Sequence, residues 1–266
     1  MRAITGVTRL YGIVADPIHQ VKAPQGLNAI LDERGIDGVL VPFHVSAADL
    51  ATFFAALRVL RSFHGMIVTV PHKTAALPLC DAVSERAAQI GAVNVVRREP
   101  DGQLLGDMFD GLGFIAGLRE AGLDPKGMRA YLVGAGGAGN AVAFALVEAG
   151  VAHLTVANRT RDRAEDLQRR LLKAHPGISV EIGSANPRGH GLVVNTTSLG
   201  MRETDPLPLD LGGLEPWMIV AESIMQPETT ALLAGAAAAG CHVHRGWPML
   251  ASQLVLMADF LGMQRE

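Results

Sequence analysis

A glycine-rich segment, Gly134-Ala135-Gly136-Gly137-Ala138-Gly139, constrains the fold of this chain more than any other feature. An apolar run precedes it and Ala-rich residues with helical spacing follow it, which is the strand–turn–helix context of a dinucleotide-binding turn. In such a turn the first glycine allows the bend, the second admits a pyrophosphate, and the third lets the helix close on its strand. The helix N-terminus adds unpaired amides and partial positive charge. The segment therefore predicts a Rossmann unit, and a purely structural glycine turn is the alternative.

The residues after the next predicted strand indicate which dinucleotide binds. An NAD-binding unit usually places a carboxylate there for the adenosine ribose, but this chain has Asn158, Arg159 and Thr160. The guanidinium of Arg159 can donate two parallel hydrogen bonds to a 2′-phosphate, and Asn158, Thr160 and Arg163 add further donors. The sequence favours NADP(H) over NAD. The alternative is that Arg159 and Arg163 are solvent-exposed residues at the start of a helix and do not bind the cofactor.

A second loop is expected to border the cofactor. Asn195 ends a predicted strand, and Thr196, Thr197 and Ser198 follow it. Open α/β sheets bind ligands at the carboxyl ends of their strands, so we expect this loop near the dinucleotide. A plain capping loop is the other interpretation.

The rest of the chain predicts an α/β fold of two lobes. Short runs rich in Val and Ile alternate with segments of helical spacing, which is typical of a mainly parallel sheet. Strands are expected at 11–14, 38–41, 66–70, 93–96 and 103–105, and helices at 24–34 and at 47–61 with Ser46 as N-cap. We predict an N-terminal domain over residues 1–107, joined by the C-terminal helix 246–266, which packs back on it. The Rossmann domain is predicted over residues 108–245.

Lys73 and Asp110 are the candidate catalytic residues. Each lies in a short loop sequence, Val68-Thr69-Val70-Pro71-His72-Lys73 and Gly106-Asp107-Met108-Phe109-Asp110. Hydride delivery to a carbonyl leaves negative charge on the oxygen, which a Lys ammonium can stabilise and protonate while a carboxylate orients it. On spacing alone, a surface lysine and a turn aspartate are the alternative.

Taken in order, these stretches and several others resemble the shikimate dehydrogenases. The further matching stretches are Asp16-Pro17-Ile18 with Lys22 and Pro24, Gly91-Ala92-Val93-Asn94, Asp110-Gly111, Gly200-Met201, Gly246, Met249-Leu250 and Gln253. The resemblance implies reversible reduction of 3-dehydroshikimate by NADPH, in a cleft between a substrate lobe and a Rossmann lobe.

The resemblance also implies roles for particular residues. Lys73 and Asp110 would be the catalytic pair, and Thr69, Asn94 and Gln253 would hold hydroxyls of the ring. Gly246 and Met249 would lie beside the nicotinamide. Without the resemblance, Met249 would be interpreted as a core residue. Gln253 could equally be a substrate contact or a hydrogen-bonded amide on the surface.

The chain departs from the family where the substrate should bind. Two serines that would hold the substrate carboxylate are replaced by Val21 and Ala23. Losing two hydrogen bonds to a charged group costs roughly 1.5–3 kcal/mol each. The sequence therefore predicts a divergent member that accepts a related alcohol with a less polar or displaced carboxylate end. Lys22 or Gln20 could rescue a displaced carboxylate, which keeps shikimate and quinate as candidates.

Four further positions near the substrate depart from the family pattern. Ile67 and Met108 each replace an Asn, Phe109 replaces a Thr, and Met225 replaces a Tyr expected near the nicotinamide. Phe109 and Met225 are therefore counted among the substrate-binding residues. Each change replaces a polar group with an apolar one.

Composition excludes several other classes of protein. The 23 basic and 26 acidic residues leave the chain near neutral without a basic stripe, so no nucleic-acid partner is expected. The first residues lack the pattern of a signal peptide, and the apolar stretch at 130–157 is interrupted by glycines and polar residues. We expect a cytoplasmic monomer or homodimer, with no membrane partner and no metal, because His242 and His244 lack a third ligand.

Two other functions stay open from the sequence. One is a quinate/shikimate-type dehydrogenase that uses NAD. The other is a non-catalytic, ligand-binding regulator on the same scaffold. The presence of both Lys73 and Asp110 favours an enzyme, because a sensor has no need of a proton donor.

Overall fold

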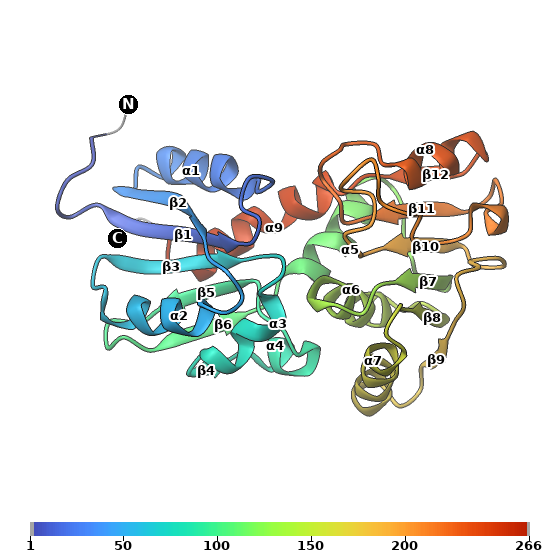
Figure 1. Cartoon of the computed structure of the whole chain (residues 1–266), viewed down its shortest axis with the longest axis horizontal. Coiled ribbons are helices and arrows are strands. Elements are labelled where there is room, and N and C mark those ends of the chain that lie inside the picture. The colour runs from blue at the N-terminus through green and yellow to red at the C-terminus, as the bar shows by residue number, and fades with distance from the viewer. Residues whose placement is uncertain (1–2, 265–266) are drawn as a thin grey trace. The chain divides into compact units, whose positions relative to one another are not determined.

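The computed structural model describes residues 3–264 and divides into two compact units (Figure 1). The first unit comprises Met1–Phe109 and Gln253–Glu266, and the second comprises Asp110–Ser252. Each unit is built around its own six-stranded sheet. The predicted α/β fold of two lobes is confirmed.

The first unit holds a mixed sheet in the order β2-β1-β3-β5-β6-β4. Its strands are β1 (Arg9–Ala15), β2 (Gly38–His44), β3 (Phe63–Val68), β4 (Ala82–Val83), β5 (Val95–Arg98) and β6 (Leu104–Asp107). Strand β1 runs parallel to β2 and β3, whereas β5 is antiparallel to both β3 and β6. A hairpin turn joins β5 and β6, and Gly102 in this turn takes a φ of +93° that favours glycine.

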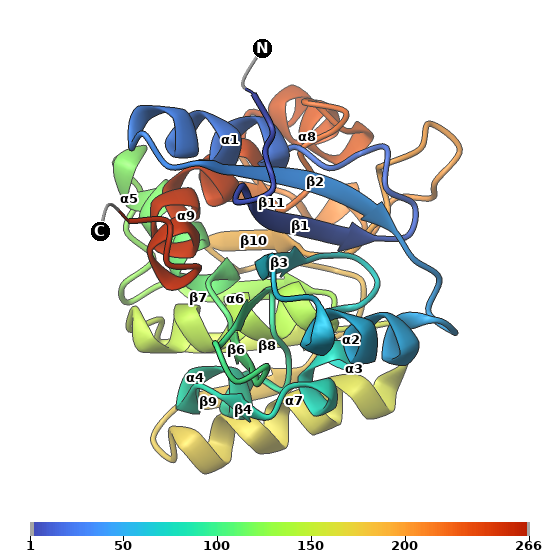
Figure 2. The same ribbon diagram turned by 90° about the vertical axis from the view of Figure 1, so that its left-hand side faces the viewer.

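Helices cover the first sheet. They are α1 (Ala23–Glu33), α2 (Leu50–Val59), α3 (Lys73–Ala76), the 3₁₀ turn η1 (Leu77–Leu79), α4 (Glu85–Ile90) and the later part of α9 (Trp247–Phe260). Right-handed crossovers from β1 to β2 and from β2 to β3 put α1 and α2 on opposite faces, as Figures 1 and 2 show. Helix α9 lies against α1, because a Cβ on Gly26 would stand 2.5 Å from Leu254 Cδ1.

The start of α2 differs from the prediction. The helix begins at Leu50 with Asp49 in the N-cap position, so Ser46 as N-cap was wrong. Ser46 Oγ instead donates to Asp49 Oδ2 at 2.7 Å and accepts from the amide of Asp49, and so stabilises a turn before the helix. Short polar side chains stabilise turns and helix starts by similar bonds, which is why the sequence did not distinguish them.

The second unit holds a fully parallel sheet in the order β12-β11-β10-β7-β8-β9. Its strands are β7 (Arg129–Val133), β8 (His153–Ala157), β9 (Ser179–Ile182), β10 (Leu192–Asn195), β11 (Ile219–Glu222) and β12 (His242–His244). The order reverses between β7 and β10, which is the switch point of a Rossmann sheet. Val133 pairs with both Ala157 and Asn195, so these three strands end level with one another.

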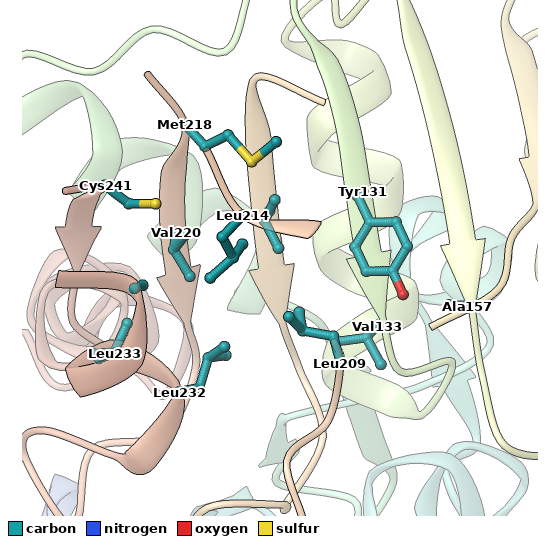
Figure 3. Close-up of a cluster of buried hydrophobic side chains, with 12 residues drawn as sticks. Tyr131, Val133, Ala157, Leu209, Leu214, Met218, Val220, Leu232, Leu233 and Cys241 are labelled. Atoms are coloured by element: carbon teal, nitrogen blue, oxygen red, sulfur yellow. The ribbon is translucent and has the colours of Figure 1, made fainter. Parts of the chain in front are cut away.

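Four helices and one 3₁₀ turn complete the second unit. They are α5 (Asp110–Glu120), α6 (Gly137–Glu148), α7 (Arg161–Ala174), η2 (Leu211–Gly213) and α8 (Ala231–Ala238). One face of the sheet packs into an apolar cluster, in which Leu232 and Leu233 of α8 lie near Val220 (Figure 3). Tyr131 is also buried there, and its hydroxyl donates to Ser184 O at 2.7 Å. Within residues 3–264 no helix has the length and apolar character needed to cross a membrane.

Candidate active site

Backbone hydrogen bonds gather the predicted substrate-side residues at one edge of the first sheet. Thr69 follows β3 and donates its amide to Val14 O of β1 at 3.1 Å. Asn94 precedes the antiparallel strand β5, and its carbonyl accepts from Val68 N at 2.8 Å. Lys73 O accepts from the amide of Val93 at 3.0 Å. Thr69, Lys73 and Asn94 are therefore close together for reasons of backbone geometry.

Lys73 lies on a rigid turn. It is half-buried and begins the short helix α3. The residue before it, His72, is 1% exposed, donates its amide to Thr69 O, and places its ring Nε2 2.9 Å from Val45 O. Because hydrogen bonds fix the main chain on both sides of Lys73, the position from which its side chain extends is well defined.

A buried pair of amides joins this edge to α9. Asn94 is 1% exposed and Gln253 is 3% exposed, and Asn94 Nδ2 donates to Gln253 Oε1 at 2.9 Å. Asn94 Oδ1 accepts from the amide of Phe109 at 2.9 Å. Gln253 is therefore not a surface amide. The sequence did not indicate that these two predicted substrate contacts also hold each other.

A charged cluster beside Phe109 was missed by the sequence analysis. Asp107 is buried, accepts from Arg86 Nη2 at 2.6 Å and from the amide of Met108 at 2.7 Å, and also bonds the hydroxyl of Ser84. The guanidinium of Arg86 lies 4.9 Å from the centroid of the Phe109 ring. No local motif marks this pairing, because the partners are separated by more than twenty residues in sequence.

Phe109 itself is 7% exposed and meets the ring of Phe260 edge-on, with the centroids 5.9 Å apart. The apolar residue that replaces the family's Thr is thus packed between a cation and an aromatic ring of its own unit. Its predicted contact with substrate stays a prediction.

Val21 and Ala23 lie at the start of α1, just after the loop that leaves β1. Ala23 is the first residue of the helix and is 3% exposed, while Val21 is half-buried and donates its amide to Ile18 O. Neither side chain has a donor. The structure therefore offers no hydroxyl at either position where the family would use serine.

In the second unit, the glycine-rich turn has the close contacts that its sequence predicts. Gly134 has a φ of +111°, and a Cβ there would stand 2.6 Å from Thr196 Oγ1. A Cβ on Gly139 would overlap the carbonyl of Gly134. Gly136, by contrast, is exposed and faces open space, and as the N-cap residue of α6 it offers no side-chain cap. Helix α6 begins at Gly137, with Ala138 in its first turn and the buried Ala135 before it.

This arrangement fits a dinucleotide. A Cβ-free backbone facing open space at a helix N-terminus leaves room and unpaired amides for a pyrophosphate. At the end of β8 no carboxylate is present, and Arg159, Thr160 and Arg163 are all exposed beside the start of α7. These donors suit a 2′-phosphate.

Asn158 also has a structural role that the sequence did not predict. Its Oδ1 accepts from the amide of Ala135 at 3.1 Å, and its Nδ2 donates to Thr160 O at 2.7 Å. The side chain ties the glycine-rich turn to the loop after β8. Its contact with the cofactor stays a prediction, but its bonds within the unit are structural.

The loop after β10 is ordered by its own hydroxyls. Thr196 Oγ1 donates to Val133 O at 3.0 Å, and Thr197 Oγ1 donates to Asn195 Oδ1 at 2.8 Å. Ser198 is exposed. Of the three hydroxyls, that of Ser198 is the one left facing solvent.

Gly246 lies against the segment after β11, and Met249 follows it on α9. A Cβ on Gly246 would overlap the carbonyl of Ile224, so only glycine fits there. Met249 is 6% exposed, and Met225, which follows Ile224, is half-buried. These residues share the carboxyl edge of the sheet with the glycine-rich turn, because the strands are parallel.

Asp110 begins α5 and is 3% exposed. The next residue, Gly111, approaches α6 so closely that a Cβ would overlap Ala141 O and stand 2.8 Å from Ala145 Cβ. Since α6 begins at the glycine-rich turn, this contact fixes the position of Asp110 relative to that turn.

Glu222 at the end of β11 is an unpredicted buried carboxyl group. It is fully buried, and burial raises its pKa to about 7, although bonds from Thr230 and Asn195 lower the pKa somewhat. Glu222 Oε2 accepts from Thr230 Oγ1 at 3.0 Å, while Oε1 has no partner among the described residues. The same Asn195 orders the loop that carries Thr197. In residues 3–264 no three His, Cys, Asp or Glu side chains gather as metal ligands would.

Comparisons with known proteins agree with this geometry. The shikimate dehydrogenase substrate binding domain matches residues 13–96, and the shikimate / quinate 5-dehydrogenase family matches residues 118–181. The NADP(+) shikimate dehydrogenase of Acidiphilium cryptum is 41% identical over 252 residues, which are 95% of this chain and 90% of the relative.

Two solved structures are also similar. The shikimate 5-dehydrogenase of Thermus thermophilus in complex with NADP(H) and shikimate is 31% identical with a TM-score of 0.84, and the match covers 97% of this chain and 95% of that one. The 5-ketofructose reductase of a Gluconobacter strain is 30% identical with a TM-score of 0.81, with 97% and 94% covered.

Replacing Gly111 by Ala should destabilise the second unit. The added methyl group has to displace the backbone of α6, and overpacking of this kind costs about 1–3 kcal/mol. Urea unfolding of Gly111→Ala, compared with the exposed Leu112→Ala in the same helix, measures the effect. Equal unfolding midpoints for the two variants would contradict the close contact.

The stability of the protein should depend on Glu222. Its pKa is near 7 in the folded chain and 4.5 without burial, so between these pH values only the folded state holds the proton. Stability contributed by this group is therefore lost as the pH rises, by at most roughly 3 kcal/mol. Glu222→Gln should gain stability relative to wild type as the pH is raised through this range. The exposed Glu203→Gln should show no such trend in thermal unfolding.

Proposed function

Because the chain belongs to the shikimate dehydrogenase family, we propose that it transfers hydride reversibly between NADP(H) and a ring alcohol or ketone such as shikimate or 3-dehydroshikimate. It is an NADP-dependent oxidoreductase, like the relative that it matches over 95% of its length. That match, with a lysine held at a sheet edge, carries the proposal. Neither the NAD-dependent alternative nor the non-catalytic regulator is better supported.

Lys73 and Asp110 are assigned to proton transfer. When NADPH is bound, its nicotinamide supplies the hydride. The ammonium of Lys73 would stabilise the negative charge that develops on the carbonyl oxygen and would give up the proton. Asp110 would keep that lysine charged and oriented. The fixed main chain around Lys73 supports this role, because a proton donor has to be held in place.

The cofactor would be held by the second unit. The exposed backbone of Gly136 and the free amides at the start of α6 suit the pyrophosphate. Arg159, with Thr160 and Arg163, would hold the 2′-phosphate. The loop from Thr196 to Ser198, together with Gly246 and Met249, would border the nicotinamide end.

The substrate end is where this chain differs from the family. Val21 and Ala23 offer no hydrogen bond to a carboxylate, so the favoured substrate has a less polar or displaced group at that end. The 5-ketofructose reductase that shares this fold acts on a ketose, and a ketose has no carboxylate. The substrate is a small molecule, while the cytoplasmic compartment and a monomeric or dimeric state remain predictions.

A substrate panel tests the proposed reaction. Oxidation of NADPH would be followed by absorbance with cyclic keto acids and with neutral cyclic and open-chain ketones. Turnover of any ring ketone supports the reaction class, and a preference for neutral ketones supports the altered carboxylate end. Absence of turnover with every compound would favour the regulator.

Changing Lys73 to Ala should reduce kcat with any accepted substrate by a factor of about 10² or more, because it removes the proton donor. The affinity for NADP should stay the same, since the dinucleotide turn lies elsewhere in the chain. Steady-state kinetics and a fluorescence titration of NADPH measure both, with the exposed Lys126→Ala as control. Undiminished turnover in Lys73→Ala would overturn the assignment.

Installing serines at both substituted positions should restore recognition of a carboxylate. Each new hydrogen bond to a charged group is worth about 1.5–3 kcal/mol, so kcat/KM for shikimate should rise at least about tenfold in the double variant. Val21→Ser and Ala23→Ser would be made together and compared with Val21→Thr alone. If kcat/KM does not rise, the carboxylate binds elsewhere.

A further inference from the structure

A basic cavity lies at the end of the first sheet opposite to Lys73. It has a volume of about 480 Å³ and is lined by the side chains of Arg61, His64, Arg97 and Arg98 with a few apolar neighbours. Phe63, which begins β3, also lines it, whereas Thr69 follows the other end of the same strand. At about 3.3 Å per residue, the strand separates this cavity from the predicted catalytic edge by roughly 20 Å. The cavity is therefore not part of the site already described.

Two of its three arginines have no carboxylate partner between residues 3 and 264. Arg97 is neutralised, since its Nη2 lies 2.6 Å from Glu99 Oε1. Arg98 instead gives its N–H groups to backbone carbonyls, two to Arg58 O at 3.1 and 2.8 Å and one to Glu99 O at 3.1 Å. These bonds orient the guanidinium but leave its charge uncompensated. Arg61 is exposed and forms no ion pair with a described residue.

His64 supports the view that the cavity is electropositive. It is half-buried beside the ring of Tyr11, with the ring centroids 5.9 Å apart. Burial lowers the pKa of its imidazole, and the positive charges of Arg9 and Arg98 lower it further. The β5–β6 hairpin carries two acids: Glu99 is paired with Arg97, and Asp101 Oδ1 accepts from the amide of Gln103 at 2.9 Å. The surroundings therefore disfavour the positively charged form of His64 and would attract an anion.

We propose that this cavity binds a small anion, a molecule bearing a phosphate or a carboxylate, between Arg61 and Arg98. A guanidinium presents a planar fork of donors that matches either group, and Arg98 is already held in position by the carbonyls it bonds. The imidazole of His64 contributes a third donor. The anion stabilises the folded first unit, because a ligand that binds only the folded state shifts unfolding towards higher temperature.

The experiment uses inorganic phosphate as the probe. Phosphate should raise the apparent Tm of the full chain in a saturable way and raise the pKa of His64, followed by NMR of its imidazole. In Arg61→Gln the Kd for phosphate should rise about tenfold, which is the loss of one charge-assisted hydrogen bond. The control is Arg119→Gln, an exposed arginine of the second unit, which should respond to phosphate as wild type does.

Two outcomes decide the proposal. If phosphate leaves the His64 resonances unchanged in the wild-type chain, the cavity binds no anion and the proposal is wrong. If Arg61→Gln binds phosphate as tightly as the control, the site is elsewhere. Neither result depends on turnover, so failure of the proposed reaction would leave this test intact.

Discussion

The edge of the first sheet that carries Lys73 depends on one residue, Asn94, and on the hydrogen bonds of its main chain and side chain. Its main chain accepts from Val68 N and donates to Asp107 O, which joins β3, β5 and β6. Its side chain accepts from Phe109 N and donates to Gln253, which adds α9. A buried amide with all of these bonds is costly to remove, because each lost partner leaves an unsatisfied polar group. The same residue was predicted to hold a substrate hydroxyl, and that contact stays a prediction.

Much of both units could be predicted because their signals are local. The glycine-rich turn, the apolar strands and the longer helices are each encoded within a few neighbouring residues. Gly134, Gly136 and Gly139 have the bend, the open space and the close contact that their spacing predicts. The lack of a carboxylate after β8 is equally local, and the NADP dependence that it predicts is confirmed by the relatives.

What the sequence could not predict arises from contacts between distant segments or from very short elements. Helices α3 and α4 and strand β4 span too few residues to show a period. The ion pair of Arg86 with Asp107, and the burial of Glu222, depend on how separate strands end beside each other. The structural role of Asn158 was also not predicted, because its amide ties together two loops that are distant in sequence, while its contact with the cofactor stays a prediction.

The apolar substitutions at the proposed substrate end are compatible with the way this edge is held together. The edge is held mainly by main-chain bonds and by Asn94, none of which uses the side chains of Val21, Ala23 or Met225. Phe109 contributes its amide to Asn94, and a backbone amide is present whatever the side chain. A change from a hydroxyl to an apolar group at these positions therefore leaves Lys73 in place. Selection can therefore change the side chains at these positions without moving Lys73, the proposed proton donor, and in this way a family can keep one reaction while its substrates diverge.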